Sequence, residues 1–219
     1  MANRNLLDGP VARPSSGGAP RSLVIALHGY GSNGEDLIGL APRWAEMLPD
    51  TLFIAPNAPQ QCPGAPGGYQ WWPLTSLTPD ARAAGVPQSA PVLNAFIDAL
   101  LKRYGLTEDR LALVGFSQGT MMALHVGPRR KRALAGIVGY SGMLADPLAL
   151  ATEVQTSPPV LLIHGDADGV IPVIAMSQAN SALQALGFET STHISRELGH
   201  GVDEAGIRLG AQFLSKVLG

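Results

Sequence analysis

The sequence predicts an α/β fold in which a mostly parallel sheet carries helices on both faces. Short apolar runs alternate with stretches of helical periodicity, which is the order expected of βαβ units. The apolar runs are nearly continuous, as in strands that are buried on both sides. Right-handed crossovers then place helices on both faces of the sheet. With 219 residues, of which 46% are hydrophobic and 15% charged, the chain is expected to form one globular domain.

The first part of the chain leads from a loose segment into two buried strands. Residues 1–21 are rich in Pro, Gly and Ser, and are expected to be a loose lead-in with a short edge strand around 6–11. The apolar run 22–27 predicts a strand buried on both faces. A helix is predicted over 36–48, because a serine and an asparagine followed by two acidic residues precede it. The run 51–55 predicts the second buried strand.

The segment 57–87 is rich in proline and glycine and carries Trp71 and Trp72 near its middle. It is too long for a plain connection in a compact domain, and loops of such length are often lids or binding loops. A linker between domains is the alternative, but a solvated linker has no use for two tryptophans. We therefore predict a lid or substrate loop at 57–87. An exposed apolar strip there would also suit a contact in a homodimer.

The rest of the chain continues the alternation. The clearest helix is predicted from Pro91 to Tyr104, where apolar residues recur at three- and four-residue spacing. Further strands are predicted at 110–114, 133–139, 159–164 and 189–194. Further helices are predicted at 117–126, 172–186 and 203–218, and the irregular segment 141–157 has room for a short one. In such a sheet, chemistry takes place beyond the carboxyl ends of the strands.

The turn Gly115-Phe-Ser-Gln-Gly119 is the strongest motif at those strand ends. A G-x-S-x-G segment between a strand and a helix is typical of a nucleophile elbow. The turn is so tight that side chains at its two ends would crowd each other, and glycine at both positions relieves the crowding. The hydroxyl of Ser117 would then project above the strand ends. The alternative is an ordinary Gly-Ser turn in a chain with 26 glycines.

A nucleophilic serine needs a base, and a histidine held by a carboxylate is the usual one. Along a chain that carries a nucleophile elbow, the acid and then the histidine follow the serine. His200 lies on the loop between the last predicted strand and the last helix. A base on that loop can reach the elbow. His125 would point away on the helix behind the nucleophile, and His193 lies within a strand. We therefore predict His200 as the base.

The acid is expected on the turn His164-Gly-Asp-Ala-Asp168, where two aspartates compete. Asp166 directly follows the glycine, and an aspartate there can tie the turn by accepting backbone N–H bonds. Asp168 lies further out on the same loop, nearer the mouth of the site, and we favour it. His164 with the two aspartates would suit a metal, but no further ligand cluster accompanies them, so no metal is predicted.

The negative oxygen of an acyl-transfer transition state needs preorganised donors. One is expected to be the backbone N–H of Gln118, the residue after the serine, at a helix N-terminus. The other is expected from the glycine-rich turn at 28–34, with Tyr30 as the candidate. A phosphate-binding loop is the alternative for that turn. It is excluded because the turn lacks both the lysine of a P-loop and the spacing of a dinucleotide fingerprint.

Composition excludes several classes of partner and location. A net charge of −2 offers no concentrated basic face for nucleic acid. We interpret the basic cluster at 129–132 as a solvated helix end rather than as a contact for an anionic surface. Cys62 is the only cysteine, which rules out an internal disulfide and fits a reducing, cytoplasmic compartment. The sequence shows no secretory signal and no apolar run for stable membrane insertion.

With these residues in place, the sequence resembles the acyl-protein thioesterase and carboxylesterase family of α/β-hydrolases. The motifs follow the family's order along residues 22–218 and stand at 27–36, 55–59, 115–119, 164–168 and 199–200. The resemblance implies an α/β-hydrolase fold without a large cap domain and without a cofactor. It also implies that Ser117, Asp168 and His200 are the nucleophile, the acid and the base.

The resemblance further assigns the oxyanion N–H groups to Tyr30 and Gln118, and implies that Trp71 and Trp72 line the acyl site. Thr120 departs from the pattern, because several members carry another glycine there. Gly169 stands where a proline is common, and the Pro- and Gly-rich stretch at 60–69 also differs.

The predicted function is that of a serine hydrolase acting on carboxylic esters, with acyl thioesters or lysophospholipids among the candidate substrates. Activity is expected to fall at low pH, where a histidine base becomes protonated. A peptidase or amidase on the same fold is the main alternative, because a triad serves many leaving groups. A binding protein that keeps the fold without turnover, and a lyase or isomerase, are further alternatives.

Overall fold

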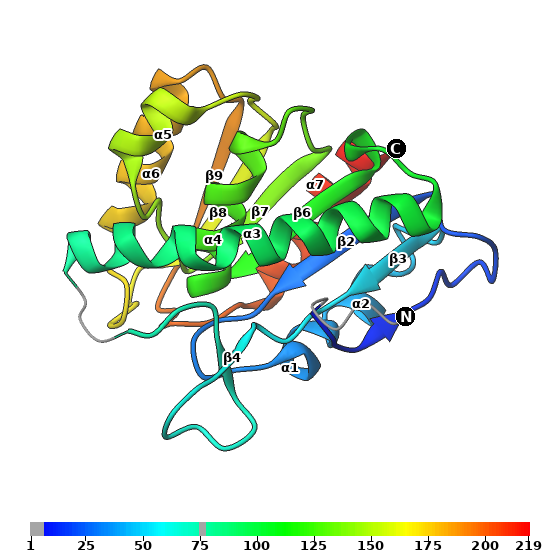
Figure 1. Cartoon of the computed structure of the whole chain (residues 1–219), viewed down its shortest axis with the longest axis horizontal. Coiled ribbons are helices and arrows are strands. Elements are labelled where there is room, and N and C mark those ends of the chain that lie inside the picture. Colours follow the sequence, from blue (N-terminus) through cyan, green and yellow to red (C-terminus); the bar gives the residue numbers. More distant parts are fainter. Residues whose placement is uncertain (1–6, 75–77) are drawn as a thin grey trace.

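The computed structural model describes residues 7–74 and 78–219. A seven-stranded sheet crosses the molecule in the order β1-β3-β2-β6-β7-β8-β9 (Figure 1). The strands are β1 (Val11–Ala12), β2 (Ser22–Leu27), β3 (Thr51–Ile54), β6 (Leu111–Phe116), β7 (Gly136–Tyr140), β8 (Val160–Gly165) and β9 (Thr190–Ser195). The edge strand β1 is antiparallel to β3, and the other neighbouring strands of this sheet are parallel. The predicted mostly parallel sheet is therefore confirmed.

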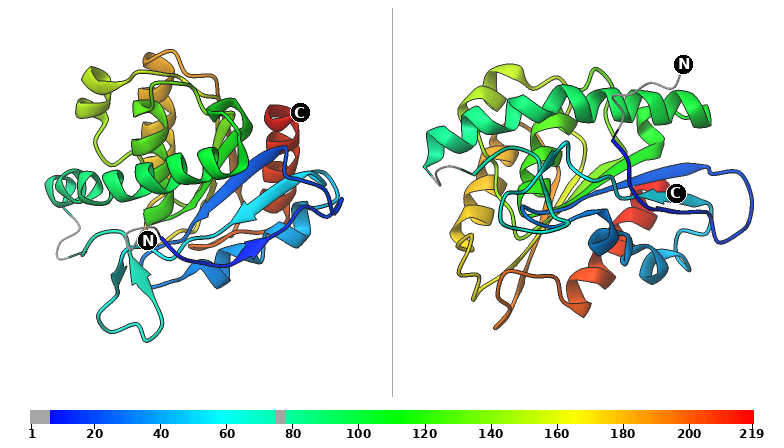
Figure 2. Two further views of the ribbon diagram at one scale, coloured as in Figure 1. Left: turned by 45° about the vertical axis from the view of Figure 1, so that its right-hand side comes forward. Right: turned by 60° about the horizontal axis from the view of Figure 1, so that its bottom comes forward.

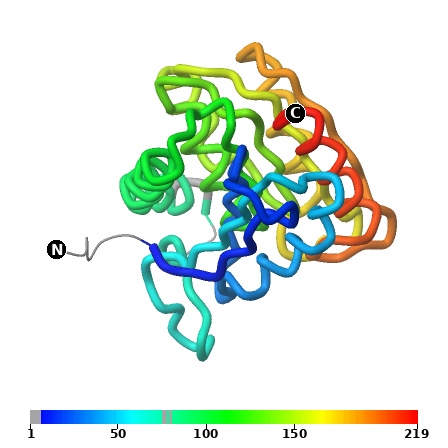
Figure 3. The backbone as a smooth tube through the Cα atoms, turned by 90° about the vertical axis from the view of Figure 1, so that its right-hand side faces the viewer, coloured from blue at the N-terminus to red at the C-terminus, as the bar shows by residue number. Residues whose placement is uncertain are grey.

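Helices cover both faces of the sheet (Figure 3). One face carries α3 (Pro79–Tyr104), α4 (Gln118–Val126), α5 (Pro147–Glu153) and α6 (Ile174–Ala185), and the other carries α1 (Gly34–Ile38), α2 (Ala41–Trp44) and α7 (Glu204–Leu218). Along β2, Leu23 and Ile25 pack into the first layer, whereas Val24 packs into the second. The apolar runs are continuous because both faces of each central strand are covered. Among the described residues, no helix is long and apolar enough to cross a membrane.

The single helix predicted over 36–48 is wrong, because the chain forms two short helices there, α1 and α2. Pro42 lies in the first turn of α2. A proline has no N–H for the carbonyl one turn earlier, and its ring crowds that carbonyl. The first helix therefore ends before Pro42 and a new one starts around it. The asparagine at 33 caps α1, as the sequence suggested.

Helix α3 begins at Pro79 rather than at Pro91, so the predicted loop 57–87 is too long at its C-terminal end. Thr78 caps the helix, and two prolines stand inside it. Packing explains why the extra turns form. A Cβ on Gly85 would stand 2.1 Å from the indole of Trp72, so the first turns of α3 lie directly on that ring. Burial against the tryptophan offsets the loss of helical hydrogen bonds at the prolines.

The remainder of the predicted loop contains a small hairpin of β4 (Gln60–Gln61) and β5 (Tyr69–Gln70), which projects from the body of the molecule (Figure 2). Its base is fastened to the turn after β2. The N–H of Gly31 donates to the carbonyl of Tyr69 over 2.8 Å, and the N–H of Tyr69 donates to the carbonyl of Ser32 over 2.7 Å. The hairpin therefore lies beside the turn that carries the predicted oxyanion donor.

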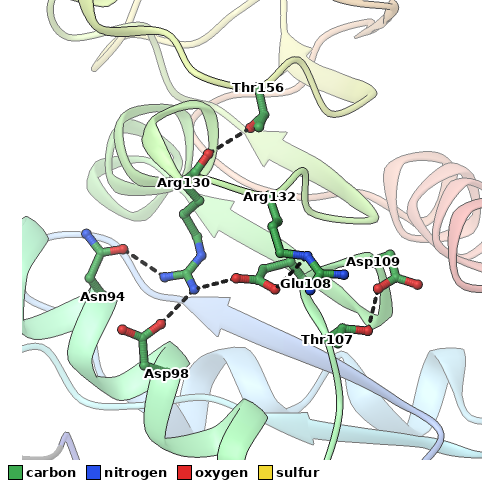
Figure 4. A network of polar contacts seen from close by, with 8 residues as sticks. All are labelled: Asn94, Asp98, Thr107, Glu108, Asp109, Arg130, Arg132 and Thr156. Carbon is green, nitrogen blue, oxygen red and sulfur yellow. Dashed lines mark hydrogen bonds and ion pairs between the residues drawn. The ribbon is translucent and has the colours of Figure 1, made fainter.

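The interpretation of the basic cluster as a solvated helix end is wrong for Arg129 and Arg130. Figure 4 shows Arg130 with its acidic partners. The side chain of Arg130 is only 8% exposed and lies 2.6 Å from Asp98 of α3 and 3.1 Å from Glu108. Arg129 lies 2.6 Å from Glu153 of α5. These two arginines therefore hold the segment after α4 to α3 and α5.

Candidate active site

Ser117 lies between β6 and α4 in a strained backbone conformation, with φ of 54° and ψ of −113°. A Cβ on Gly115 would stand 2.5 Å from the carbonyl of Gly119, and a Cβ on Gly119 would stand 1.9 Å from the carbonyl oxygen of Leu27. No larger side chain fits at either glycine. The turn therefore has the crowding expected of a nucleophile elbow.

Thr120, the departure from the family pattern, fastens the strand ends beneath Ser117. Its hydroxyl lies 2.8 Å from the carbonyl oxygen of Gly115 in β6 and 2.9 Å from that of Tyr140 in β7. The same Tyr140 carbonyl accepts the N–H of Ser117 over 2.9 Å. The side chain of Thr120 fits because its neighbour is glycine: a Cβ on Gly142 would stand 2.3 Å from the Cβ of Thr120.

Asp168 and His200 lie together at the carboxyl end of the sheet. The Nδ1 of His200 is 2.8 Å from Oδ2 of Asp168, and the aspartate side chain is fully buried. The other oxygen, Oδ1, accepts the N–H groups of Val170 and Ile171, each over 2.9 Å. Burial alone would raise the pKa of Asp168, but the hydrogen bonds from His200 and from these two N–H groups outweigh it and lower that pKa.

The lowered pKa keeps Asp168 ionised, and an ionised carboxylate only accepts hydrogen bonds. The proton of the bond is therefore on Nδ1 of His200. In the neutral imidazole, the lone pair is then on Nε2. The ring of His200 packs on Phe116, with 4.9 Å between ring centroids. Phe116 directly precedes Ser117, so the histidine lies beside the elbow.

His164 lies against the loop that carries Asp168. Its Nε2 donates to the carbonyl of Ile171 over 2.7 Å and lies 3.2 Å from Oδ2 of Asp168. It therefore binds the backbone of the loop 165–171, which carries Asp168 and is called the acid loop below. Its place at the end of β8, four residues before Asp168, was a signal for this contact. In the described part of the chain, no group of His, Cys, Asp or Glu side chains is arranged to hold a metal ion.

The competing titratable residues lie in other surroundings. Asp166 is exposed, and its carboxylate accepts the N–H of Glu197 over 2.6 Å, which ties the loop. His125 lies on α4 behind the elbow, where burial lowers its pKa to about 4. His193 is half-buried in β9.

The turn after β2 lies next to the nucleophile. A Cβ on Gly29 would stand 3.2 Å from the Cβ of Ser117. The N–H groups of Gly31 and Ser32 are bonded within the protein, whereas the N–H of Tyr30 makes no hydrogen bond to another described residue. Gln118 is the first residue of α4, where backbone N–H groups have no partner inside the helix. Both predicted donors therefore keep N–H groups that a ligand can use.

Trp71 and Trp72 are buried, with exposed fractions of 0% and 1%. The Nε1 of Trp71 donates to the carbonyl of His28 over 3.0 Å. The backbone of both tryptophans binds the side chain of Gln118. Sequence reasoning missed this role of the Gln118 amide, because only the fold brings residues 71 and 118 together.

Comparison with known proteins agrees with this geometry. The family model described as Phospholipase/Carboxylesterase matches residues 13–218. The chain belongs to this family. Membership, together with the sheet order, confirms the α/β-hydrolase fold and places the chain among hydrolases of the carboxylesterase type.

Individual relatives in this family are esterases and thioesterases by name. The chain is 27% identical over 194 residues to Esterase YpfH of Escherichia coli K12, covering 89% of this chain and 82% of that protein. It is 33% identical over 169 residues to acyl-protein thioesterase 1 of Schizosaccharomyces pombe, covering 73% and 74% of the two chains. The crystal structure of esterase PE8 is 45% identical, with a TM-score of 0.93 over 97% of this chain and 100% of that one.

Proposed function

We propose that the protein hydrolyses carboxylic esters, thioesters among them, through an acyl-enzyme on Ser117. The observation that carries the proposal is the 2.8 Å hydrogen bond between Asp168 and His200, beside the strained serine. A histidine that is held in this way at Nδ1 presents Nε2 as a general base. Membership of a carboxylesterase family supports ester chemistry at the site.

In the first half of the reaction, Oγ of Ser117 attacks the acyl carbonyl carbon while Nε2 of His200 takes the hydroxyl proton. The bond from that carbon to the leaving oxygen or sulfur then breaks, and His200 returns the proton to the leaving group. Ionised Asp168 stabilises the imidazolium that forms in between. In the second half, His200 takes a proton from water, the hydroxide attacks the acyl carbon, and the carboxylic acid leaves as the proton returns to Ser117.

The tetrahedral intermediates carry a negative oxygen, which we assign to the backbone N–H groups of Tyr30 and Gln118. The closeness of Gly29 to Ser117 and the unbonded N–H of Tyr30 support this assignment. Such donors act without reorganisation because the fold holds them in place before the substrate binds.

We also propose that the segment 57–74, with Trp71 and Trp72, borders the acyl group. What supports this is its attachment to the Tyr30 turn through the Gly31–Tyr69 hydrogen bond. The chain-length preference would then be set at the hairpin, because both tryptophans are buried behind it.

A fluorophosphonate probe tests the proposal directly, because it phosphonylates an activated serine. The wild type and the control variant Ser181→Ala, at an exposed serine of α6, should be labelled, whereas Ser117→Ala should not. Absence of labelling in the folded wild type would overturn the proposal in favour of a binding protein.

A substrate series then defines the leaving group and the acyl chain. It consists of p-nitrophenyl esters of increasing length, a matching p-nitroanilide and a palmitoyl thioester. Turnover of the esters with little turnover of the anilide is expected. Faster turnover of the anilide than of its matching ester would favour a peptidase or amidase.

A further inference from the structure

The side chain of Gln118 is fully engaged, although only its backbone N–H is needed for the chemistry proposed above. Its Oε1 accepts the backbone N–H of Trp71 over 2.9 Å, and its Nε2 donates to the carbonyl of Trp72 over 2.9 Å. Gln118 is 1% exposed. Both ends of the amide are therefore bound inside the protein, which fixes the orientation of the first residue of α4.

Trp71 is bonded on its other side to the turn after β2. The indole Nε1 donates to the carbonyl of His28 over 3.0 Å, and the two rings lie 5.9 Å apart between centroids. The hydroxyl of Ser89 in α3 donates to the carbonyl of Trp71. One buried residue thus contacts the turn that carries Tyr30, the helix that carries Gln118, and α3.

His28 is itself fixed by two hydrogen bonds. Its Nε2 accepts the N–H of Ala58 over 2.9 Å, and its Nδ1 lies 2.7 Å from the carbonyl of Gly29. Because a carbonyl can only accept, the proton is on Nδ1 and the ring is neutral. Burial lowers the pKa of His28, so this pattern persists below neutral pH. The carbonyl to which Trp71 is bonded therefore belongs to a rigid residue.

We propose that Trp71 and the Gln118 amide form a brace that sets the distance between the Tyr30 and Gln118 N–H groups. This inference rests on the proposed hydrolase function. An oxyanion hole stabilises the transition state only if both donors stand about 2.7–3.1 Å from the developing oxyanion. Here the donors lie on segments remote in sequence, and Trp71 is hydrogen-bonded to both segments. Trp71 and the Gln118 side chain are positioning groups and need not touch the reacting atoms.

The brace predicts a specific kinetic signature, because misplaced donors weaken binding of the transition state more than binding of the substrate. In Trp71→Phe the ring remains and the bond to His28 is lost. We expect kcat to fall about 10- to 100-fold, with KM changed less than about threefold. An alkyl trifluoromethyl ketone is attacked by Ser117 to give a tetrahedral oxyanion. Affinity for this inhibitor should fall by the same factor as kcat.

Trp44→Phe is the matched control. Trp44 is equally buried, and its Nε1 donates to the carbonyl of Ile207 over 2.9 Å, on the opposite face of the sheet. This variant should lose comparable thermal stability and keep its kcat within about twofold, since it lies outside the site. Gln118→Met removes the hydrogen bonds of the side-chain amide and keeps the side-chain volume. Its kcat is a second test of the brace.

Measured on folded protein, equal kcat and equal ketone affinity in Trp71→Phe and Trp44→Phe would overturn the brace, and an unchanged kcat in Gln118→Met would do the same. A fall in kcat without a fall in ketone affinity would also contradict it. Failure of the wild type to react with the fluorophosphonate would instead count against the hydrolase function itself, so the two failures are distinguishable.

Discussion

The Nε2 of His164 lies 3.2 Å from Oδ2 of Asp168, the same oxygen that binds His200. His164 is 1% exposed, and it also holds the carbonyl of Ile171. A second histidine thus donates to the acid loop from the interior of the sheet. We therefore expect this buried N–H to help position Asp168 and, through it, His200.

Replacing His164 by phenylalanine should therefore impair catalysis without affecting substrate binding. The ring volume is kept, but the Ile171 carbonyl loses its donor and Asp168 loses a polar neighbour at 3.2 Å. We expect kcat to fall about tenfold with KM unchanged, because a small displacement of the base slows proton transfer. Steady-state kinetics on a p-nitrophenyl ester measure the change. His164→Gln, which restores an N–H donor, should recover part of it, and His193→Phe on the adjacent strand should stay near wild type.

The two aspartates of the acid turn should differ strongly in their effect on turnover. Asp168→Asn removes the carboxylate that holds His200 in the required tautomer, so kcat should fall by about 10³- to 10⁴-fold. Asp166 is exposed on the same loop, and Asp166→Asn keeps an oxygen that can accept the N–H of Glu197. Its kcat should stay within about threefold of wild type. The reverse order of the two effects would show that Asp166 is the acid.

His125 should make the protein less stable as pH falls below about 6.5. Burial is the main cause that lowers its pKa to about 4, with Arg129 adding to the shift and Glu153 and Asp146 opposing it. Below pH 6.5 His125 is protonated in the unfolded chain and stays neutral in the folded protein. The free energy of unfolding therefore decreases as the pH falls, down to about pH 4. Urea unfolding of wild type and His125→Gln at pH 7.5 and 5.0 measures this. A pH dependence equal in both proteins would refute the assignment.

Arg130 should contribute to folding through its buried ion pair. In Arg130→Ala, Glu108 keeps a charge that is only 16% exposed and loses its nearest cation. Arg132 remains 3.7 Å from Glu108, so the carboxylate keeps one cation. We therefore expect the free energy of unfolding to fall by about 2 kcal/mol, as when hydrogen bonds to a charged group are lost. Lys131→Ala, at an exposed neighbouring position, should change it by less than about 0.5 kcal/mol. Urea denaturation measures both, and equal stabilities would mean that the pair is not needed.

The strands and the elbow were predictable because they depend on local patterns. A strand covered on both faces must be apolar throughout, so runs such as 22–27 are visible without knowledge of their partners. The elbow needs glycine at 115 and 119 for steric reasons within five residues. The order of serine, aspartate and histidine then places the remaining groups on loops at the same end of the sheet.

The errors arose where contacts between distant residues decide the structure. The early turns of α3 form because Gly85 packs on Trp72, although its prolines argue against a helix. Arg130 lies in a run of basic residues, and its burial depends on acidic partners from two other segments. The amide of Gln118 binds residues that are far from it in the sequence. None of these contacts leaves a periodicity or a spacing that the sequence alone reveals.

The packing of Thr120 against Gly142 has a consequence for how such sequences can change. The two positions share one methyl-sized space, so a side chain can occupy it from α4 or from the segment after β7, but not from both. Gly142→Ala alone creates a clash. Thr120→Gly alone leaves a void, and the carbonyl oxygens of Gly115 and Tyr140 lose the hydroxyl that binds them. The double exchange fills the space again. A lineage moving between the two arrangements must therefore pass through a less stable intermediate, and the order of the two steps decides whether that intermediate is strained or loosely packed.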